Sequence, residues 1–128
     1  MTLSPEDLMT LVLAVTGRPV RWYLGGPKGE WDPVRRRVGV RHGMSDAQTR
    51  STLAHELAHA LHGDAAGHDS RAEHRADLFA ARLLISPGAF AGAEALYGTD
   101  TDRIAEELCV TCHLVDVWRA AVRDAGHA

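Results

Sequence analysis

Two histidines spaced four residues apart, His55 and His59, are the residues of this 128-residue chain best suited to chemistry. The segment from His55 to His59 reads H-E-L-A-H and has the H-E-x-x-H pattern of metal sites built on a helix. Residues four apart lie on one helix face, so both imidazoles can converge on one ion. Glu56 follows the first histidine and is placed to act as general base on a metal-activated water. Because the pattern also arises by chance, it needs a third ligand.

The best candidate for that third ligand is Glu73, fourteen residues after His59, with Asp77 one helical turn later on the same face. In such a pair the first carboxylate can bind the metal and the second can hold the free N–H of a ligand histidine. The alternative is that Glu73 only caps its own helix through Ser70, which would leave Asp77 unexplained. We therefore predict Zn²⁺ bound by His55, His59 and Glu73, with a fourth position left for water.

Three other histidines, His62, His68 and His74, compete for the third ligand position. The longer pattern H-E-x-x-H-x-x-G-x-x-H is not met, because His62 stands where glycine is required and Ala65 where the third histidine is required. On a helix, His74 points about 100° away from Glu73. We interpret these three histidines as surface or partly buried side chains.

Helix signals surround the candidate ligands. Ser4 and Pro5 start a helix that ends near Gly17. A capping box of Ser45 to Gln48 starts the helix that carries both histidines and runs to His62. A second possible box, Ser70 to Glu73, starts a helix that stops before Pro87. Three further helices are predicted, from Ser86-Pro87 to about Tyr97, from Asp102 to Leu108 and from Cys112 to Arg123.

Two β-prone runs precede the histidine helix, Val20 to Leu24 and Val34 to Val40, with a turn-rich segment at Gly25 to Gly29 between them. They predict a small antiparallel sheet packed on the metal-binding helix. The fold class expected is α+β and zincin-like, with additional helices and a single domain over residues 1–128. The run at 37–40 lies just before the metal helix, so we hypothesise that it pairs with an extended substrate as an edge strand.

Composition restricts the partners. The net charge of −3 gives no general attraction to nucleic acid, so no direct nucleic-acid contact is expected. The two cysteines, Cys109 and Cys112, are too few and too close for a secreted disulfide framework. The apolar run from Leu8 to Val15 follows two acids and is too short to span a bilayer, so we expect no export signal, no membrane contact and a cytoplasmic location.

The two stretches that carry the candidate ligands are similar to those of a known family. Thr52 to His59 reads T-L-A-H-E-L-A-H, and Glu73 to Pro87 reads E-H-R-A-D-L-F-A-A-R-L-L-I-S-P. They resemble the ImmA/IrrE family of metallopeptidases, which typically shows T-L-A-H-E-L-G-H followed by E-x-E-A-N-x-F-A-A-x-L-L-M-P. The departures are Ala58 for Gly, Arg75 for Glu, Asp77 for Asn and the extra residue Ser86.

The resemblance implies a zinc-dependent peptidase in which His55, His59 and Glu73 hold the metal and Glu56 is the catalytic base. It also implies that the substrate is a protein and that this protein is a helix-turn-helix repressor, because such repressors are often the known substrates in that family. A second group that stabilises the oxyanion is usual in such enzymes. Candidates in this chain are His42, His62, Tyr97 and Arg75, and the sequence does not rank them.

The rival function lies in the C-terminal part of the chain. Residues 104–118 have the apolar spacing of a helix-turn-helix, which would make the protein a DNA-binding or protein-binding regulator. The second helix of that pair has no Arg or Lys before Arg119, so phosphate contact is poorly supported. The string from Cys109 to His113 also matches C-x-x-C-H, the attachment motif for haem, but that chemistry normally requires export.

Overall fold

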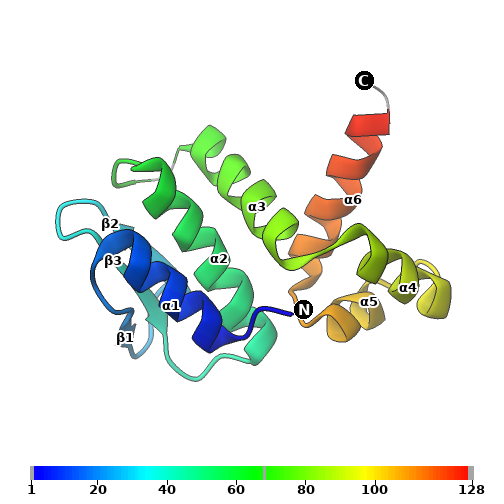
Figure 1. Ribbon diagram of the computed structural model, residues 1–128, viewed down its shortest axis with the longest axis horizontal. Coiled ribbons are helices and arrows are strands. Elements are labelled where there is room, and N and C mark those ends of the chain that lie inside the picture. The colour runs from blue at the N-terminus through cyan, green and yellow to red at the C-terminus, as the bar shows by residue number, and fades with distance from the viewer. Residues whose placement is uncertain (1, 68, 127–128) are drawn as a thin grey trace.

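The computed structural model describes residues 2–67 and 69–126, and this part of the chain forms six helices and one three-stranded sheet (Figure 1). The α+β class predicted from the sequence is confirmed. His68, one of the competing ligands, lies outside the described residues. The elements in chain order are α1 (Pro5–Thr16), β1 (Arg21–Tyr23), β2 (Gly29–Asp32), β3 (Arg37–Arg41), α2 (Asp46–His62), α3 (Ser70–Leu84), α4 (Pro87–Tyr97), α5 (Thr101–Leu108) and α6 (Cys112–Gly126).

Local capping signals fix where α1 and α2 begin. Ser4 and Ser45 each accept a hydrogen bond from the third helical amide, and the side chain at that third position accepts one from the backbone N–H of the cap residue, as a capping box requires. The box predicted at Ser70 is wrong, because Asp69 caps α3 and its carboxylate accepts from the Arg71 amide. A carboxylate at this position also interacts favourably with the positive end of the helix dipole.

The sheet is mixed, so the predicted antiparallel arrangement is only partly correct. The strand order is β1-β3-β2, with β2 antiparallel and β1 parallel to β3. The sequence analysis missed β2, which lacks a β-branched run and follows directly on the glycine-rich turn. Since the chain runs along β1, returns along β2 and reverses again into β3, the first and third strands point the same way.

The turn between β2 and β3 explains why β3 begins at Arg37 and not at Val34. The carboxylate of Asp32 accepts hydrogen bonds from the amides of Val34 and Arg35, which closes a tight turn in place of a strand. Arg36 then adopts a left-handed conformation, with φ of 51°, before pairing starts. β3 is the central strand, paired with β2 over residues 37–40 and with β1 over residues 39–41, so the hypothesis that residues 37–40 form an edge strand is wrong.

Helix α2 lies between the sheet with α1 on one side and α3 with α6 on the other, and α4 and α5 lie beyond α6 (Figure 1). Its apolar face supplies Leu53, Ala54 and Leu57 to the core, which also includes Val38 and Val40 of β3. Most of the remaining core side chains come from the other helices, chiefly Leu8, Val12, Ala80, Ile104, Leu114 and Val115, and Ile85 joins them directly after α3.

In the described part of the chain, none of the helices combines the length and apolar character that crossing a membrane requires.

Arg50 on α2 ties the N-terminal segment and the end of α5 to the core. This residue is 2% exposed, and its guanidinium donates to the carbonyl of Leu3 at 2.6 Å and to that of Leu108 at 3.1 Å, with a further contact to the Cys109 carbonyl. The last two carbonyls lie at the C-terminal end of α5, where the helix dipole favours a cation. One nitrogen, Nη2, is buried and finds no hydrogen-bond partner among the described residues. The turn before α6 is therefore held to α2 by a buried cation.

We predict that Arg50→Met lowers the free energy of unfolding by about 2–4 kcal/mol, because three carbonyl groups lose a charged donor in the interior. Urea unfolding followed by circular dichroism measures this change. The matched control is Arg18→Met, at an exposed arginine, which should stay within about 0.5 kcal/mol of the wild type. Equal effects of the two substitutions would contradict the role given to Arg50.

Candidate metal centre

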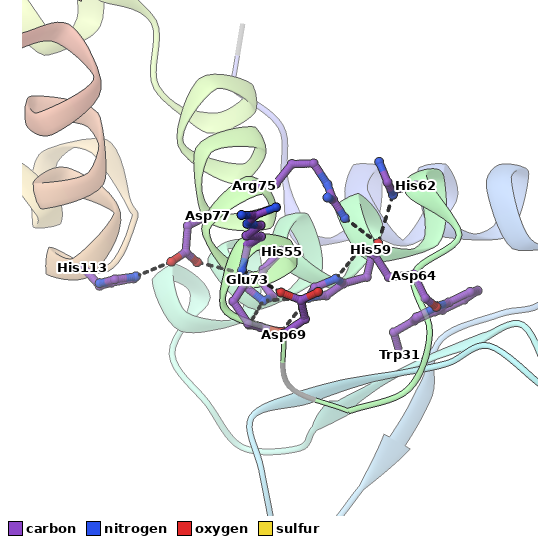
Figure 2. Close-up of polar contacts among 11 residues, drawn as sticks. Trp31, His55, His59, His62, Asp64, Asp69, Glu73, Arg75, Asp77 and His113 are labelled. Carbon is purple, nitrogen blue, oxygen red and sulfur yellow. Dashed lines mark hydrogen bonds and ion pairs between the residues drawn. The ribbon is translucent and has the colours of Figure 1, made fainter. Parts of the chain in front are cut away.

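Close packing of α2 against α3 brings the candidate ligands together. The two helices meet through small buried side chains, Ala54 on α2 and Ala76 and Ala80 on α3, which allow the backbones to approach closely. His55 and His59 lie one turn apart on α2, and Glu73 lies in the first turn of α3. The side chains from both helices point into the space between them (Figure 2).

The three side chains offer ligand atoms that all lie within 4.8 Å of one another. The Nε2 atoms of His55 and His59 are 3.1 Å apart. One oxygen of Glu73 is 2.9 Å from Nε2 of His55, and the other is 3.1 Å from Nε2 of His59. Glu73 is not used as a cap, since the cap of α3 is Asp69, so its carboxylate is available to a metal. This arrangement could hold one ion, and the assignment of these residues as zinc ligands stays a prediction.

The opposite nitrogens of both rings determine which atoms face that centre. Nδ1 of His55 is 2.9 Å from Oδ1 of Asp77, and Nδ1 of His59 is 2.8 Å from Oδ2 of Asp64. A carboxylate only accepts, so each Nδ1 carries a proton, and in the neutral imidazole that binds a metal each Nε2 then presents a lone pair. In that form two imidazole lone pairs and one carboxylate face one another. Such a set is electrostatically unfavourable alone and is satisfied by a cation, so these residues fit a metal ion.

Asp77 contacts the ring of His55, the kind of contact that its spacing from Glu73 predicted, and its role beside a metal stays a prediction. Burial opposes its ionisation, but hydrogen bonds from His55 and from His113 outweigh that effect and hold the pKa of Asp77 below its usual range. The carboxylate therefore stays charged and keeps the ring of His55 oriented. Its second oxygen is engaged by His113 of α6, 2.9 Å away, a contact that the sequence analysis did not anticipate (Figure 2).

Asp64 is the second supporting carboxylate, and sequence reasoning missed it. It follows the glycine that ends α2, where no periodicity marks a residue as important. Besides His59, its side chain contacts His62 at 3.0 Å and forms a short ion pair with Arg75, while its backbone carbonyl accepts from the indole of Trp31 at 2.9 Å. Burial opposes ionisation of Asp64, yet the hydrogen bonds from His59 and Arg75 keep its pKa below the usual range.

Glu56 lies beneath β2 with its side chain almost fully buried. Burial is the largest influence on it and raises the pKa of Glu56 to about 7, although His55 and His59 oppose that shift. Gly29 of β2 makes this proximity possible, because a Cβ there would lie 2.5 Å from Thr52 and 3.0 Å from Glu56. A carboxylate with a pKa near neutrality can both accept and return a proton, as a general base must.

Two cavities meet at His55 and Glu56. One, of about 390 Å³, lies between β2 and the loop after α2 and is lined by Glu30, Trp31 and Glu73. The other, of about 380 Å³, lies towards the start of α6 and is lined by Lys28, Thr52, Asp77 and His113. A polypeptide crossing the candidate metal centre therefore has space on both sides of Glu56.

The candidates for a second oxyanion donor are placed as follows. His62 and Arg75 both contact Asp64, and the hydroxyl of Tyr97 donates to Glu107 at 3.3 Å on another part of the surface. His42 packs edge-on against Trp22 of β1. None of these four side chains lines either of the two cavities that meet at Glu56. His74, a competing ligand, is exposed and is not part of the cluster around Glu73.

A comparison with known protein families is consistent with the geometry of the candidate metal centre. The IrrE N-terminal-like domain of the M78 peptidase family matches residues 13–117. A search among curated proteins found no match. The matched region includes both candidate ligand helices and the first residues of α6.

We predict that Glu56→Gln changes the pH dependence of stability in the metal-free protein. Because the folded state raises the pKa of Glu56 from 4.5 to about 7, it holds the proton more tightly than the unfolded chain. This stabilisation is present below pH 4.5 and is lost as the pH rises through 7. Relative to wild type, the variant should therefore gain about 2–3 kcal/mol in unfolding free energy between pH 5 and pH 8. Urea unfolding with a chelator present measures it, and a difference independent of pH would contradict the prediction.

Proposed function

Because the chain belongs to the M78 peptidase family, we propose that it is a zinc-dependent endopeptidase of the H-E-x-x-H type, similar to the gluzincins. Membership itself implies a metallopeptidase in general terms. The observation that most supports the narrower proposal is the set of three acceptors, from His55, His59 and Glu73, that converge beside Glu56. We take Zn²⁺ as the metal because two imidazoles and one carboxylate with an open position suit catalytic zinc.

The proposed reaction is hydrolysis of a peptide bond by water. A zinc ion held by the three ligands would supply Lewis acidity, which acidifies water and polarises a carbonyl. Glu56 would accept the proton of the attacking water and then deliver it to the leaving amine. Asp77 and Asp64 would keep the two ligand imidazoles in the tautomer that presents Nε2. Burial beneath β2 supports the role of Glu56, since it raises the affinity of the carboxylate for the proton.

The substrate is proposed to lie along β2, which replaces β3 as the candidate edge strand. β2 pairs with β3 on one side only, and Gly29 to Trp31 border the cavity beside Glu73. An extended peptide could add to the free edge through main-chain hydrogen bonds, with its scissile carbonyl above Glu56. Glu30 is exposed on this strand and pairs only weakly with Arg21, at 3.4 Å, so it could contact a substrate side chain.

The substrate class and the cellular location are proposed from the sequence. We propose a helix-turn-helix repressor as substrate, on the resemblance of the ligand stretches alone. Two free cysteines support a reducing compartment such as the cytoplasm. The rival function in DNA binding has little support, because the first turn of α6 faces the metal centre, where His113 contacts Asp77. We propose no direct contact with nucleic acid.

Zinc binding is the first test. The wild-type protein should bind one zinc ion per chain, and Glu73→Ala should weaken that binding by about 100-fold or more, since loss even of an outer partner costs 10–100-fold. Competition with a chromophoric chelator measures the affinity, and elemental analysis measures the stoichiometry. Glu94→Ala, at an exposed position on α4, is the matched control and should bind as wild type does. Undiminished zinc in Glu73→Ala would remove Glu73 from the ligand set.

Peptidase activity is the second test, with Glu56→Gln as the diagnostic variant. The zinc-loaded wild type should cleave members of a mixed-sequence fluorogenic peptide library and a purified helix-turn-helix repressor, with new N-termini identified by mass spectrometry. The variant should keep its zinc and lose about 10²–10⁴-fold in turnover, the usual contribution of a general base. Cleavage by the variant at the wild-type rate would refute the mechanism, and cleavage of peptides without the repressor would refute only the substrate class.

A further inference from the structure

Asp77 lies between two histidines that come from different helices. Its Oδ1 accepts from Nδ1 of His55 on α2, and its Oδ2 accepts from Nε2 of His113 on α6, both at 2.9 Å (Figure 2). The carboxylate is 21% exposed and the imidazole of His113 is 66% exposed. The two contacts use both oxygens of Asp77, so together they fix the rotation of the carboxylate about its last side-chain bond.

The first turn of α6 is held firmly enough to position His113. The amide of Thr111 donates to Oγ of Ser51 at 3.2 Å, and Ser51 is buried one turn before His55 on α2. The Thr111 hydroxyl in turn accepts from the amide of Leu114, which caps the start of the helix. Leu114 itself is only 2% exposed and packs in the core. The start of α6, which carries His113, is therefore hydrogen-bonded to α2, the helix that carries two of the candidate metal ligands.

We propose that His113 is a positioning residue of the metal centre, which donates Nε2–H to Asp77 and so holds that carboxylate in the orientation required by His55. The inference rests on the proposed metal-dependent function. With this contact α6 becomes the third helix that contributes to the site, beside α2 and α3. The hydrogen bond that orients Asp77, and through it His55, comes from His113 of α6. Removing the donor would let Asp77 rotate towards solvent, and the ring of His55 would lose part of its fixed orientation.

The chemistry of the contact limits how large the effect can be. His113 does not touch the ligand nitrogen directly, and its exposed side chain exchanges this hydrogen bond for water at modest cost. Residues that hydrogen-bond directly to a ligand histidine contribute 10–100-fold in metal affinity. A residue that is one hydrogen bond further from the ligand should therefore contribute roughly three- to tenfold. An effect of this size is measurable by chelator competition without any substrate.

The test compares His113→Leu with His113→Gln in the full-length chain, using zinc as the probe. Leu removes the donor, whereas the terminal amide of Gln places an N–H at about the reach of Nε2. We expect His113→Leu to bind zinc roughly three- to tenfold more weakly and His113→Gln to stay within about twofold of wild type. The exposed His42→Leu is the matched control and should leave affinity unchanged. Metal-free melting temperatures of all variants should match the wild type.

A double-mutant cycle with Asp77→Asn separates positioning from a general structural role. If His113 acts through Asp77, then His113→Leu in the Asp77→Asn background should change zinc affinity by less than about twofold. The proposal is overturned if His113→Leu binds zinc as tightly as wild type, if Leu and Gln weaken binding equally, or if the effect persists undiminished in the Asp77→Asn background. Failure of the wild type to bind zinc would instead overturn the proposed function.

Discussion

The convergence of two imidazole Nε2 atoms and one carboxylate between two helices is the constraint on which the rest of this structure depends. The lone pairs of His55 and His59 meet the carboxylate of Glu73 because Asp77 and Asp64 hold the protons of both rings on the far side. With both rings neutral, a positive charge between the three groups stabilises such a set. Three further features matter because they surround that centre. They are the neighbouring carboxylates, the burial of Glu56 and the two cavities beside it.

Helix α2 organises this centre because most of what surrounds the site is attached to it. β2 lies against it through Gly29, whose missing side chain lets the strand approach Glu56. The turn before α6 is fastened to it by Arg50 and Ser51. α3 packs along it through alanines and supplies Glu73 and Asp77. The same contacts that stabilise the fold therefore set the distances within the candidate metal centre, so positioning of the site and folding are not separable.

Sequence reasoning succeeded where the signal is local and periodic. Helical spacing placed His55 and His59 on one face of α2, and the pair that Glu73 forms with Asp77 singled out the carboxylate that lies beside them. The N-cap at Ser4 and the capping box at Ser45 predicted two helix starts. The capping rule failed only at α3, where Ser70 and the preceding aspartate both satisfy it and the carboxylate caps the helix.

The features that were missed depend on contacts between segments distant in the chain. β2 has no strand-forming run and exists because it pairs with β3, which also makes the sheet mixed. Asp64 belongs to a loop that acquires its role from the ligand histidine before it and Arg75 after it. The sequence placed His113 in a cysteine motif and in the rival helix-turn-helix, and not at the metal centre, since its partner Asp77 lies 36 residues away.

The most direct test of the central claim is anomalous diffraction at the zinc edge from crystals grown with zinc. The account predicts one peak about 2.0–2.2 Å from Nε2 of both histidines and from the Glu73 carboxylate. A peak elsewhere, or none at this position, would contradict it.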